Sequence, residues 1–433
     1  MLEFCQKSST FVPEMNSIVR DSAKLLTANV VAQAIGLLVY PILTRLYSPD
    51  DFGLLNLFMS IGGVLVLLST AEYQYAIVLP KDENKARSVF QVALLVLLGV
   101  TCLVALSIPF SRPIASLFKA ADLARWWWLM PIYVAALGGW NVMNYYYIRQ
   151  SRFTRISSYW VSQSVVNAGA KLSFGCLGWL NGGLILGATL GPVCTMAYHV
   201  LTDWRKRLRN WFVIDGSLNL EMARAYRNFP CFSLPKSLVN MVSTNLPTFM
   251  LVPVFGLERI GYWALAIMVS FQPINIIARS IYQVLYQKVA ENVQQGMSIW
   301  RIIWNYTWKM GLATIAGLAF LYAFIPWLVT TLFGAQWASC ASLIRYLYPV
   351  LALTVLSAVL CFLPDIFGRQ RGAFILEVIN LGLLVAALLL GIHLADFQRS
   401  IMLYSLAETL YILIQLGWFA RLISRYEQSI ALR

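Results

Sequence analysis

Long apolar runs alternate with short polar connections along nearly the whole chain. The first two runs cover residues 24–46 and 53–79, and each exceeds the roughly 20 residues with which an α-helix crosses about 30 Å of hydrocarbon. In the polar turn between them, Pro49 cannot continue the first helix and Ser48 can cap the second. The pattern predicts two membrane helices joined by a tight turn outside the hydrocarbon.

The same pattern recurs to the end of the chain and predicts about twelve membrane helices. Their expected ranges are 24–46, 53–79, 87–110, 127–148, 157–178, 183–202, 236–255, 260–285, 306–331, 345–366, 373–394 and 401–420. We therefore expect an all-α polytopic membrane protein with two six-helix lobes. The expected divisions are an N-terminal segment 1–23, an N-lobe 24–202, a linker 203–235, a C-lobe 236–420 and a tail 421–433.

Composition and charge agree with a membrane protein and give its orientation. Of the 433 residues, 59% are apolar and only 12% are charged, whereas soluble domains carry about 25% charged residues. Of the 33 Lys and Arg residues, 24 fall on the side of the linker and 7 on the opposite side. Positive loops stay inside, so we expect both termini to be cytoplasmic. This distribution explains the net charge of +14 without any binding of nucleic acid.

Two six-helix groups joined by a cytoplasmic linker would point the same way through the membrane. Repeats of this kind are related by an axis along the membrane normal. A weak trace of such a repeat is visible, because the segment 50–53 (DDFG), followed by Ser60, resembles the segment 258–261 (ERIG), followed by Ser270. Each segment opens the second predicted helix of its half.

Polar side chains within the apolar runs are the candidate functional residues. A charge at the bilayer centre costs about 2.5–3.5 kcal/mol on insertion scales, so it is expected to face a cavity or a partner. The predicted substrate-binding residues are Arg279, Lys171, Arg45, Gln272, Asn275, Gln33, Asn29, Asn240, Thr244, Asn167 and Trp140. The alternative is that the polar side chains only join helices, at about 0.6 kcal/mol each, or form a structural pair such as Glu72 with Arg279.

Three acidic residues are candidates for ion coupling, and one tryptophan is a candidate for stacking on a sugar. Glu72, Glu377 and Glu408 are predicted within the second, eleventh and twelfth helices, where they could take up H⁺ or Na⁺. Trp140 lies nearer to the middle of its helix than the neighbouring Trp and Tyr runs. The alternative for these aromatic residues is an interfacial belt.

Several classes of function lack their sequence signals. The chain has no Gly-x4-Gly-Lys-Ser/Thr loop for nucleotide phosphates. Its seven cysteines do not stand at metal or redox spacings, and it has only two histidines. It also has no carboxylate pair at a membrane edge of the kind that a metal-dependent glycosyltransferase needs. We therefore expect no cofactor, no metal site and no enzyme activity.

Several segments resemble the polysaccharide flippase family, the Wzx-type O-antigen and oligosaccharide-lipid exporters of the MOP superfamily. The segments are TRLYSPDDFG, AEYQYAIVLPKDENKA, YYYIRQSRFTRISSYWVSQSVVNAG, YRNFPCFSLPKSLVNMVSTNLPTFML, IGYWALAIMVSFQPINIIARSIYQVLYQK and LFGAQWASCASLIRYLYPVL. Together they cover most of residues 20–365, and the specificity comes from their order and spacing. The resemblance implies a MOP/MATE-like fold in a bacterial inner membrane.

The resemblance also implies a cargo and a mechanism. The cargo would be an undecaprenyl-diphosphate-linked oligosaccharide, such as an O-antigen, capsule or exopolysaccharide repeat unit, flipped by alternating access. A glycan polymerase and a chain-length regulator would be partners. Arg279 and Lys171 would attract the diphosphate, and Arg45 would bind phosphate at the outer mouth. Three rivals stay open: a MATE-like drug or cation antiporter, a lipid II-type flippase and a membrane glycosyltransferase.

Overall fold

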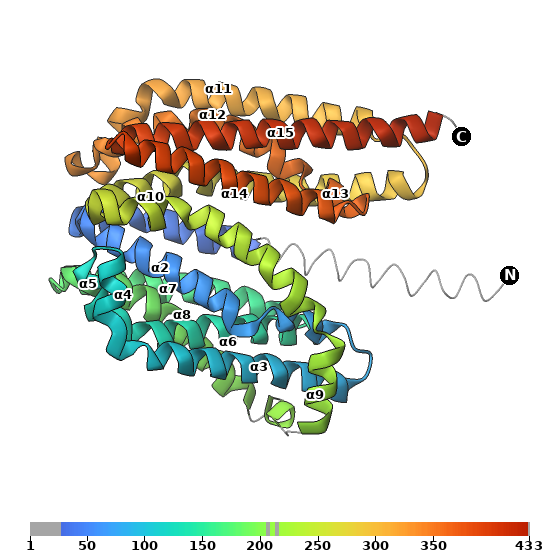
Figure 1. Ribbon diagram of the computed structural model, residues 1–433, viewed down its shortest axis with the longest axis horizontal. Helices are drawn as coiled ribbons and strands as arrows, with labels where there is room; N and C mark the ends of the chain where they lie inside the picture. Colours follow the sequence, from blue (N-terminus) through green and yellow to red (C-terminus); the bar gives the residue numbers. More distant parts are fainter. Residues whose placement is uncertain (1–26, 205–207, 213–215, 432–433) are drawn as a thin grey trace. The chain divides into compact units, whose positions relative to one another are not determined.

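The chain folds into helices joined by turns (Figure 1). The computed structural model describes residues 27–204, 208–212 and 216–431, except for the side chains of residues 181, 275–277, 279, 280, 283 and 284. No strand occurs among these residues. The all-α class predicted from hydropathy is therefore confirmed.

Long helices follow one another along the chain. They are Thr27–Leu46 and then α2 (Pro49–Thr70), α3 (Glu83–Leu106), α6 (Met130–Arg149), α7 (Phe153–Cys176), α8 (Leu180–Trp204), α10 (Leu234–Gln294), α11 (Trp300–Phe333), α12 (Ser339–Leu360), α14 (Gln370–His393) and α15 (Phe397–Ala431). The connecting helices are η1 (Tyr73–Val78), η2 (Ile108–Phe110), α4 (Ser111–Leu117), α5 (Ala121–Trp126), η3 (Trp127–Leu129), η4 (Leu208–Phe212), α9 (Gly216–Ala225), η5 (Phe229–Ser233), η6 (Ala335–Trp337) and α13 (Leu363–Ile366).

Helix α10 is two helices joined at Gly256. This glycine has a φ of 83°, a left-handed value that suits glycine at the end of a helix. With α10 counted as two, each of the twelve predicted ranges contains a long helix, although the helix of the second range ends at Thr70. Within the described chain, nine helices meet the length and hydropathy expected of a membrane span, and α6 and α7 are too polar to be among them. The number of membrane crossings and the cytoplasmic placement of both termini stay predictions.

Local sequence signals explain where two of these helices begin. Asp51 accepts hydrogen bonds from the backbone N–H and the hydroxyl of Ser48, at 2.9 and 2.7 Å, and its own N–H lies 3.3 Å from the Ser48 hydroxyl. This reciprocal arrangement resembles a capping box, with Asp51 in place of the usual Glu or Gln, and it starts α2. At α3, the carboxylate of Asp82 caps the helix by accepting from the Asn84 N–H at 2.9 Å. The polar turn predicted between the first two helices thus has the expected chemistry.

The described residues divide into two compact units. Unit 1 consists of the residues up to Leu46, Ile61–Ala115 and Ala121–Leu238, and unit 2 consists of Tyr47–Ser60, Ser116–Ala120 and the residues from Val239 onward. The boundary between the units falls inside α2 and inside α10. The lobe boundaries expected from the sequence stay a prediction.

Unit 1 is built around α3, α6, α7 and α8. Helix α7 packs along α8, while α6 packs on both α3 and α8, and α9 lies against α3 (Figure 1). Its core is rich in aromatic rings, including Phe90 of α3, Tyr146 and Trp140 of α6, and Trp211 of η4. Since Trp211 belongs to the connection after α8, that connection is part of the core.

Unit 2 contains α11, α12, α14 and α15, which lie side by side in Figure 1. One apolar cluster includes Ile303 of α11, Phe362 and Phe419, and a second one is formed by Val350 of α12 with Tyr411 and Ile412 of α15. Helix α15 runs on to Ala431. Residues 421–431, predicted as a tail, therefore continue the last helix.

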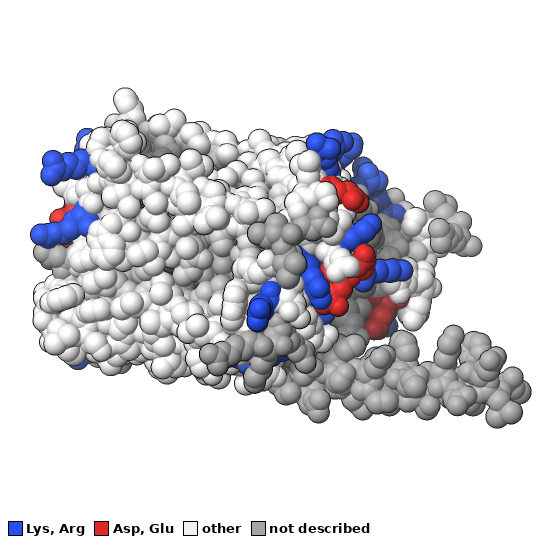
Figure 2. Space-filling view, turned by 90° about the horizontal axis from the view of Figure 1, so that it is seen from below, with Lys and Arg blue, Asp and Glu red and all other residues white. Residues whose placement is uncertain are grey.

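The surface has the character expected of helices in lipid. On the face drawn in Figure 2, the coloured charged residues gather toward the two ends and leave a broad band without charge between them. Helix α11 exposes several large apolar side chains, among them Leu312, Ile315 and Phe320. Exposed apolar surface of this kind marks an interaction with membrane or another partner.

Candidate functional site

Three helices of unit 2 bring polar side chains together around Glu377 of α14. One carboxylate oxygen of Glu377 lies 3.5 Å from Asn240 Nδ2 of α10, and the other accepts a hydrogen bond from the Tyr411 hydroxyl of α15 at 3.3 Å. Gln415 Nε2 donates to the same tyrosine oxygen at 3.1 Å. The structure thus joins a predicted ion-coupling residue, Glu377, to a predicted substrate contact, Asn240.

A second carboxylate, Glu408 of α15, lies close to this network. It accepts a hydrogen bond from Asn380 of α14 at 3.5 Å, and its side chain is half-buried. The same two helices therefore hold both predicted ion-coupling residues of unit 2. Carboxylate and amide oxygens are ligands that hard cations prefer, and a carboxylate can also take up a proton.

Other predicted contacts also fall on α10. Thr244 is exposed one turn after Asn240 and donates to the Asn240 carbonyl at 2.9 Å, while Gln272 is half-buried. The side chains of Asn275 and Arg279 lie outside the described residues. Their roles stay predictions.

Two predicted contacts of unit 1, Lys171 and Asn167 of α7, lie against glycines of α8. A Cβ atom on Gly187 would stand 2.5 Å from Lys171 Cγ, and one on Gly191 would stand 2.9 Å from Asn167 Cβ. Because neither glycine has a side chain, the two helices approach closely. Lys171 is only 7% exposed. Its aliphatic stem is thus in a helix contact, and the substrate role of its ammonium group stays a prediction.

The predicted polar stripe of the first helix is partly satisfied within unit 1. Gln33 Nε2 donates to Asn29 Oδ1 at 3.1 Å, and the Ser164 hydroxyl of α7 donates to the Ala32 carbonyl at 2.6 Å. Asn29 and Gln33 are half-buried, whereas Arg45 is exposed in the last turn of the helix. The end position predicted for Arg45 agrees with the structure, and its binding role stays a prediction.

Trp140 lies in the aromatic core of unit 1. It is 2% exposed, and its indole stacks on the Tyr159 ring with the planes 2° apart. His199 and Tyr147 also lie against it. A sugar ring could reach this face of the indole only by displacing Tyr159. We therefore leave Trp140 out of the site proposed below.

The placement of Glu72 inside the second membrane helix is wrong. Helix α2 ends at Thr70, because Ala71 and Glu72 have left-handed φ values of 45° and 61°. Glu72 instead precedes η1 and is 2% exposed. Burial raises the pKa of its carboxyl, against the opposing effects of a hydrogen bond with Ser237 and the charge of Lys236. Its ion-coupling role stays a prediction at this new position.

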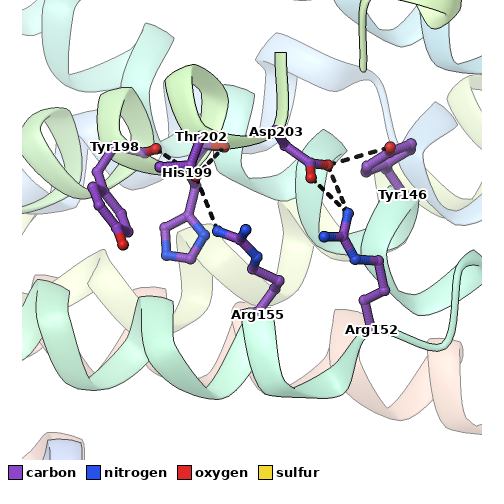
Figure 3. Close-up of polar contacts among 7 residues, drawn as sticks. All are labelled: Tyr146, Arg152, Arg155, Tyr198, His199, Thr202 and Asp203. Carbon is purple, nitrogen blue, oxygen red and sulfur yellow. Dashed lines mark hydrogen bonds and ion pairs between the residues drawn. The ribbon is translucent and has the colours of Figure 1, made fainter. Parts of the chain in front are cut away.

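Sequence reasoning missed a buried ion pair at the α6–α7 turn (Figure 3). Arg152 Nη1 lies 2.7 and 2.8 Å from the two carboxylate oxygens of Asp203, near the end of α8, and the Tyr146 hydroxyl donates to the same carboxylate at 3.3 Å. Burial lowers the pKa of the Arg152 guanidinium, but the hydrogen bond and charge of Asp203 outweigh it and raise the pKa above its usual value. The Arg152 guanidinium thus keeps its charge in this buried position.

The same corner is extended by Arg155, whose Nη1 donates to the Thr202 hydroxyl at 2.9 Å (Figure 3). The two arginines tie the start of α7 to the end of α8. Little in the sequence indicates this role, because Lys and Arg are expected in any loop on this side of the membrane. The available clue was Asp203, a single acidic residue near the end of the apolar helix α8.

Within the described ranges, no three His, Cys, Asp or Glu side chains gather as they would around a metal ion. The polar groups of the two units are instead pairs and short chains of carboxylates, amides and hydroxyls. Such groups can hold a proton, a hard cation or a polar ligand. Together with the long apolar helices, they define a multi-pass membrane protein with polar side chains among its helices.

A comparison with protein-family models places the chain in a family. Residues 42–342 match the model described as "Polysaccharide biosynthesis protein". The match spans more than half of the chain, so the chain belongs to this family. The resemblance noted in the sequence is confirmed.

One curated relative supports the same placement. The succinoglycan biosynthesis transport protein ExoT of Rhizobium meliloti (strain 1021) is 22% identical over 353 residues. The alignment covers 77% of this chain and 65% of the relative, so the chain spans less than two thirds of that protein. The printed name of this relative describes a transport protein of polysaccharide biosynthesis.

Solved structures share the fold. The lipid II flippase MurJ in an inward closed conformation has a TM-score of 0.71 at 11% identity, covering 96% of this chain and 92% of its own. An inward-facing multidrug resistance MATE family transporter of the MOP superfamily has a TM-score of 0.65 at 16% identity, covering 93% and 95%. These likenesses confirm the MOP/MATE-like fold expected from the sequence.

Proposed function

We propose that this protein is a flippase for an undecaprenyl-diphosphate-linked oligosaccharide in a bacterial inner membrane. It would expose its polar groups alternately to the two sides of the membrane, and ion uptake would drive the cycle. Its cargo would be a repeat unit of O-antigen, capsule or exopolysaccharide, supplied to a glycan polymerase and a chain-length regulator. The family supports a cargo from polysaccharide biosynthesis, and the printed name of the relative supports transport.

One structural observation carries the proposal. Two ionisable side chains with polar neighbours, Glu377 and Glu408, occur within the long helices of unit 2, and Lys171 is buried within α7 of unit 1. Placing such groups in a membrane is costly, and they typically mark the path of a substrate or an ion. Cationic groups suit a diphosphate, and amides and hydroxyls suit sugars.

Reconstitution tests the function directly. Liposomes would contain the purified protein and a synthetic undecaprenyl-diphosphate-linked oligosaccharide with a fluorescent sugar. A membrane-impermeant quencher would then report how fast inner-leaflet cargo reaches the outside. We expect wild type to move the cargo, Arg279→Ala to fall to the protein-free rate, and Arg279→Lys to keep part of the activity because it keeps the charge.

Arg301→Ala is the matched control, since Arg301 is an exposed cation at the start of α11. It should move cargo as fast as wild type. Protein content and orientation in the vesicles must be equal among the variants. Cargo movement by Arg279→Ala at the wild-type rate would reject the role of Arg279, and a wild-type protein that moves no cargo would reject the function.

The acidic network of unit 2 favours a second candidate, a MATE-like cation antiporter. Glu377 and Glu408 could hold an organic cation in exchange for H⁺ or Na⁺. Efflux of ethidium from the same liposomes under a sodium or proton gradient tests this candidate. Ethidium movement without any cargo movement would favour antiport over the flippase.

A further inference from the structure

A polar pocket lies at the end of unit 1, where the turn after α6 meets the start of α3. Its volume is 530 Å³, within the range of about 300–1,000 Å³ found for small-molecule sites. Three cationic residues, Lys81, Arg87 and Arg149, line it together with a single acidic one, Glu83. The lining therefore carries a net positive charge, on the side of the protein that the Lys and Arg distribution predicts to be cytoplasmic.

Two hydrogen bonds to the backbone hold the Arg149 guanidinium in place. Its Nη1 donates to the carbonyl oxygens of Ile77 and Pro80, at 3.1 and 2.7 Å. These bonds fix the guanidinium of α6 against the segment that leads into α3. A fixed cation loses little conformational entropy when it binds an anion.

Arg87 has an unused donor at the same place. Its Nη2 pairs with Glu83 at 2.9 Å, while its Nε is buried and has no hydrogen-bond partner among the described residues. A buried donor without an acceptor is unfavourable, so the hydrogen bonding of the Arg87 guanidinium is incomplete, and Arg87 also lines the pocket. The first turn of α3, which begins at Glu83, adds the positive end of a helix dipole.

We propose that this pocket binds a phosphate-bearing anion. Two guanidinium groups and an ammonium group match the charge and the acceptor geometry of phosphate oxygens. The phosphate could come from an anionic phospholipid headgroup, since basic pockets at the cytoplasmic side recognise such headgroups, or from a soluble phosphate compound. None of the predicted substrate or ion-coupling residues lines this pocket, and its occupation does not depend on the transport function proposed above.

Pyrophosphate is the soluble probe for the site. Binding to the full-length protein in neutral detergent would be measured by calorimetry at low salt. The double variant Lys81→Ala/Arg87→Ala should bind at least tenfold more weakly than wild type, and affinity should fall as salt rises. Lys85→Ala is the control, because Lys85 is an exposed cation in the first turns of α3 that does not line the pocket. Arg149 is left unchanged, since it holds the chain segment around it.

Lipid binding separates the two sources of phosphate. Native mass spectrometry would compare lipids retained from nanodiscs of phosphatidylglycerol and of phosphatidylcholine. Retention of phosphatidylglycerol that is lost in the double variant assigns a lipid headgroup, and pyrophosphate binding alone assigns a soluble compound. A wild-type protein that binds neither probe would overturn the proposal, as would equal losses in the double variant and Lys85→Ala. If the double variant does not fold, Lys81→Ala alone gives the comparison, because Lys81 is exposed.

Discussion

Gly53 of α2 lies against the backbone of Leu257 in α10, so that a Cβ atom built on the glycine would stand 1.9 Å from the Leu257 carbonyl oxygen. The reciprocal contact is made by Gly261, whose Cβ would stand 1.8 Å from the carbonyl oxygen of Pro49. Leu257 precedes Gly261 by one helical turn, and Pro49 precedes Gly53 by one turn. The two helices therefore touch through equivalent positions.

Reciprocal contacts of this kind form between equivalent segments around a two-fold axis. The sequence indicated the same equivalence, because residues 50–53 resemble residues 258–261 and each segment opens the second helix of its half. The contact supports the predicted repeat. It also explains why both positions are glycine, since any side chain would force the backbones apart.

The first prediction concerns this contact. Gly53→Ala and Gly261→Ala should each lower the free energy of unfolding, by about 1–3 kcal/mol or more, because the added methyl group meets a backbone carbonyl that cannot turn away. Thermal unfolding of the detergent-purified variants measures the effect. Gly99→Ala in α3 is the control, since nothing lies within 4 Å of its added Cβ. Equal unfolding temperatures in all three variants would show that the contact is looser than described.

Hydropathy and capping residues were sufficient to predict most of the helices, because both signals are local. The run that ends at Leu46 and the Ser48 and Asp51 turn are examples. The end of α2 was missed for a physical reason. The two residues with left-handed backbone conformation after α2 are Ala71 and Glu72. Helices usually end at a Gly or an Asn in this conformation, and neither residue is of that type. The predicted range was therefore extended past them to residue 79.

The candidate site was predictable only in part. Glu377 and Glu408 stand out in any apolar sequence, but their partners Asn240 and Asn380 depend on how the helices of unit 2 pack. Packing also decides the surroundings of Trp140, because the ring that covers it comes from a different helix. A single sequence gives the position of each residue along its helix but not the neighbour it meets.

The second prediction concerns the buried ion pair of unit 1. Asp203→Asn leaves the Arg152 guanidinium without its charge partner at a carboxylate position that is fully buried. Removing one partner of a buried pair typically costs about 3–5 kcal/mol. Chemical unfolding of the purified protein measures the loss.

The exposed pair of Glu83 and Arg87 provides the comparison for this prediction. Glu83→Gln should cost only about 0.3–0.5 kcal/mol, because exposed pairs one helical turn apart contribute little. The double variant Arg152→Gln/Asp203→Asn should lose less stability than the sum of its single changes, since the pair is coupled. Additive losses would mean that Arg152 and Asp203 act independently.

The third prediction concerns ion coupling and assumes the transport function proposed above. Glu377→Gln removes the charge and the proton-accepting oxygen while keeping the shape of the side chain. Cargo movement in liposomes should then lose its acceleration by an imposed sodium or proton gradient. Glu291→Gln is the control, because Glu291 is exposed near the end of α10 and its carboxylate accepts a hydrogen bond from Gln287 one turn earlier. Full acceleration in Glu377→Gln would remove this residue from the coupling mechanism.

The fourth prediction concerns the start of α11, which is capped from another helix. Glu427 of α15 accepts hydrogen bonds from the backbone N–H groups of Ile299 and Trp300, at 2.8 and 2.9 Å, and from the Ser298 hydroxyl at 3.0 Å. A carboxylate is stabilising there because the helix N-terminus is positive. Glu427→Ala should therefore lower stability by about 0.5–2 kcal/mol, as the loss of a helix cap does.

Hydrogen exchange shows whether this effect is local to the cap. Amides in the first turn of α11 should exchange faster in Glu427→Ala, including that of Ile303, which donates to the Ile299 carbonyl. Ser429→Ala is the control, since its hydroxyl donates to the Tyr426 carbonyl within α15. Unchanged exchange at Ile303 would mean that α11 holds its first turn without the carboxylate. Faster exchange there, with the middle of α11 unchanged, would show that the last turns of α15 act as the cap of a separate helix.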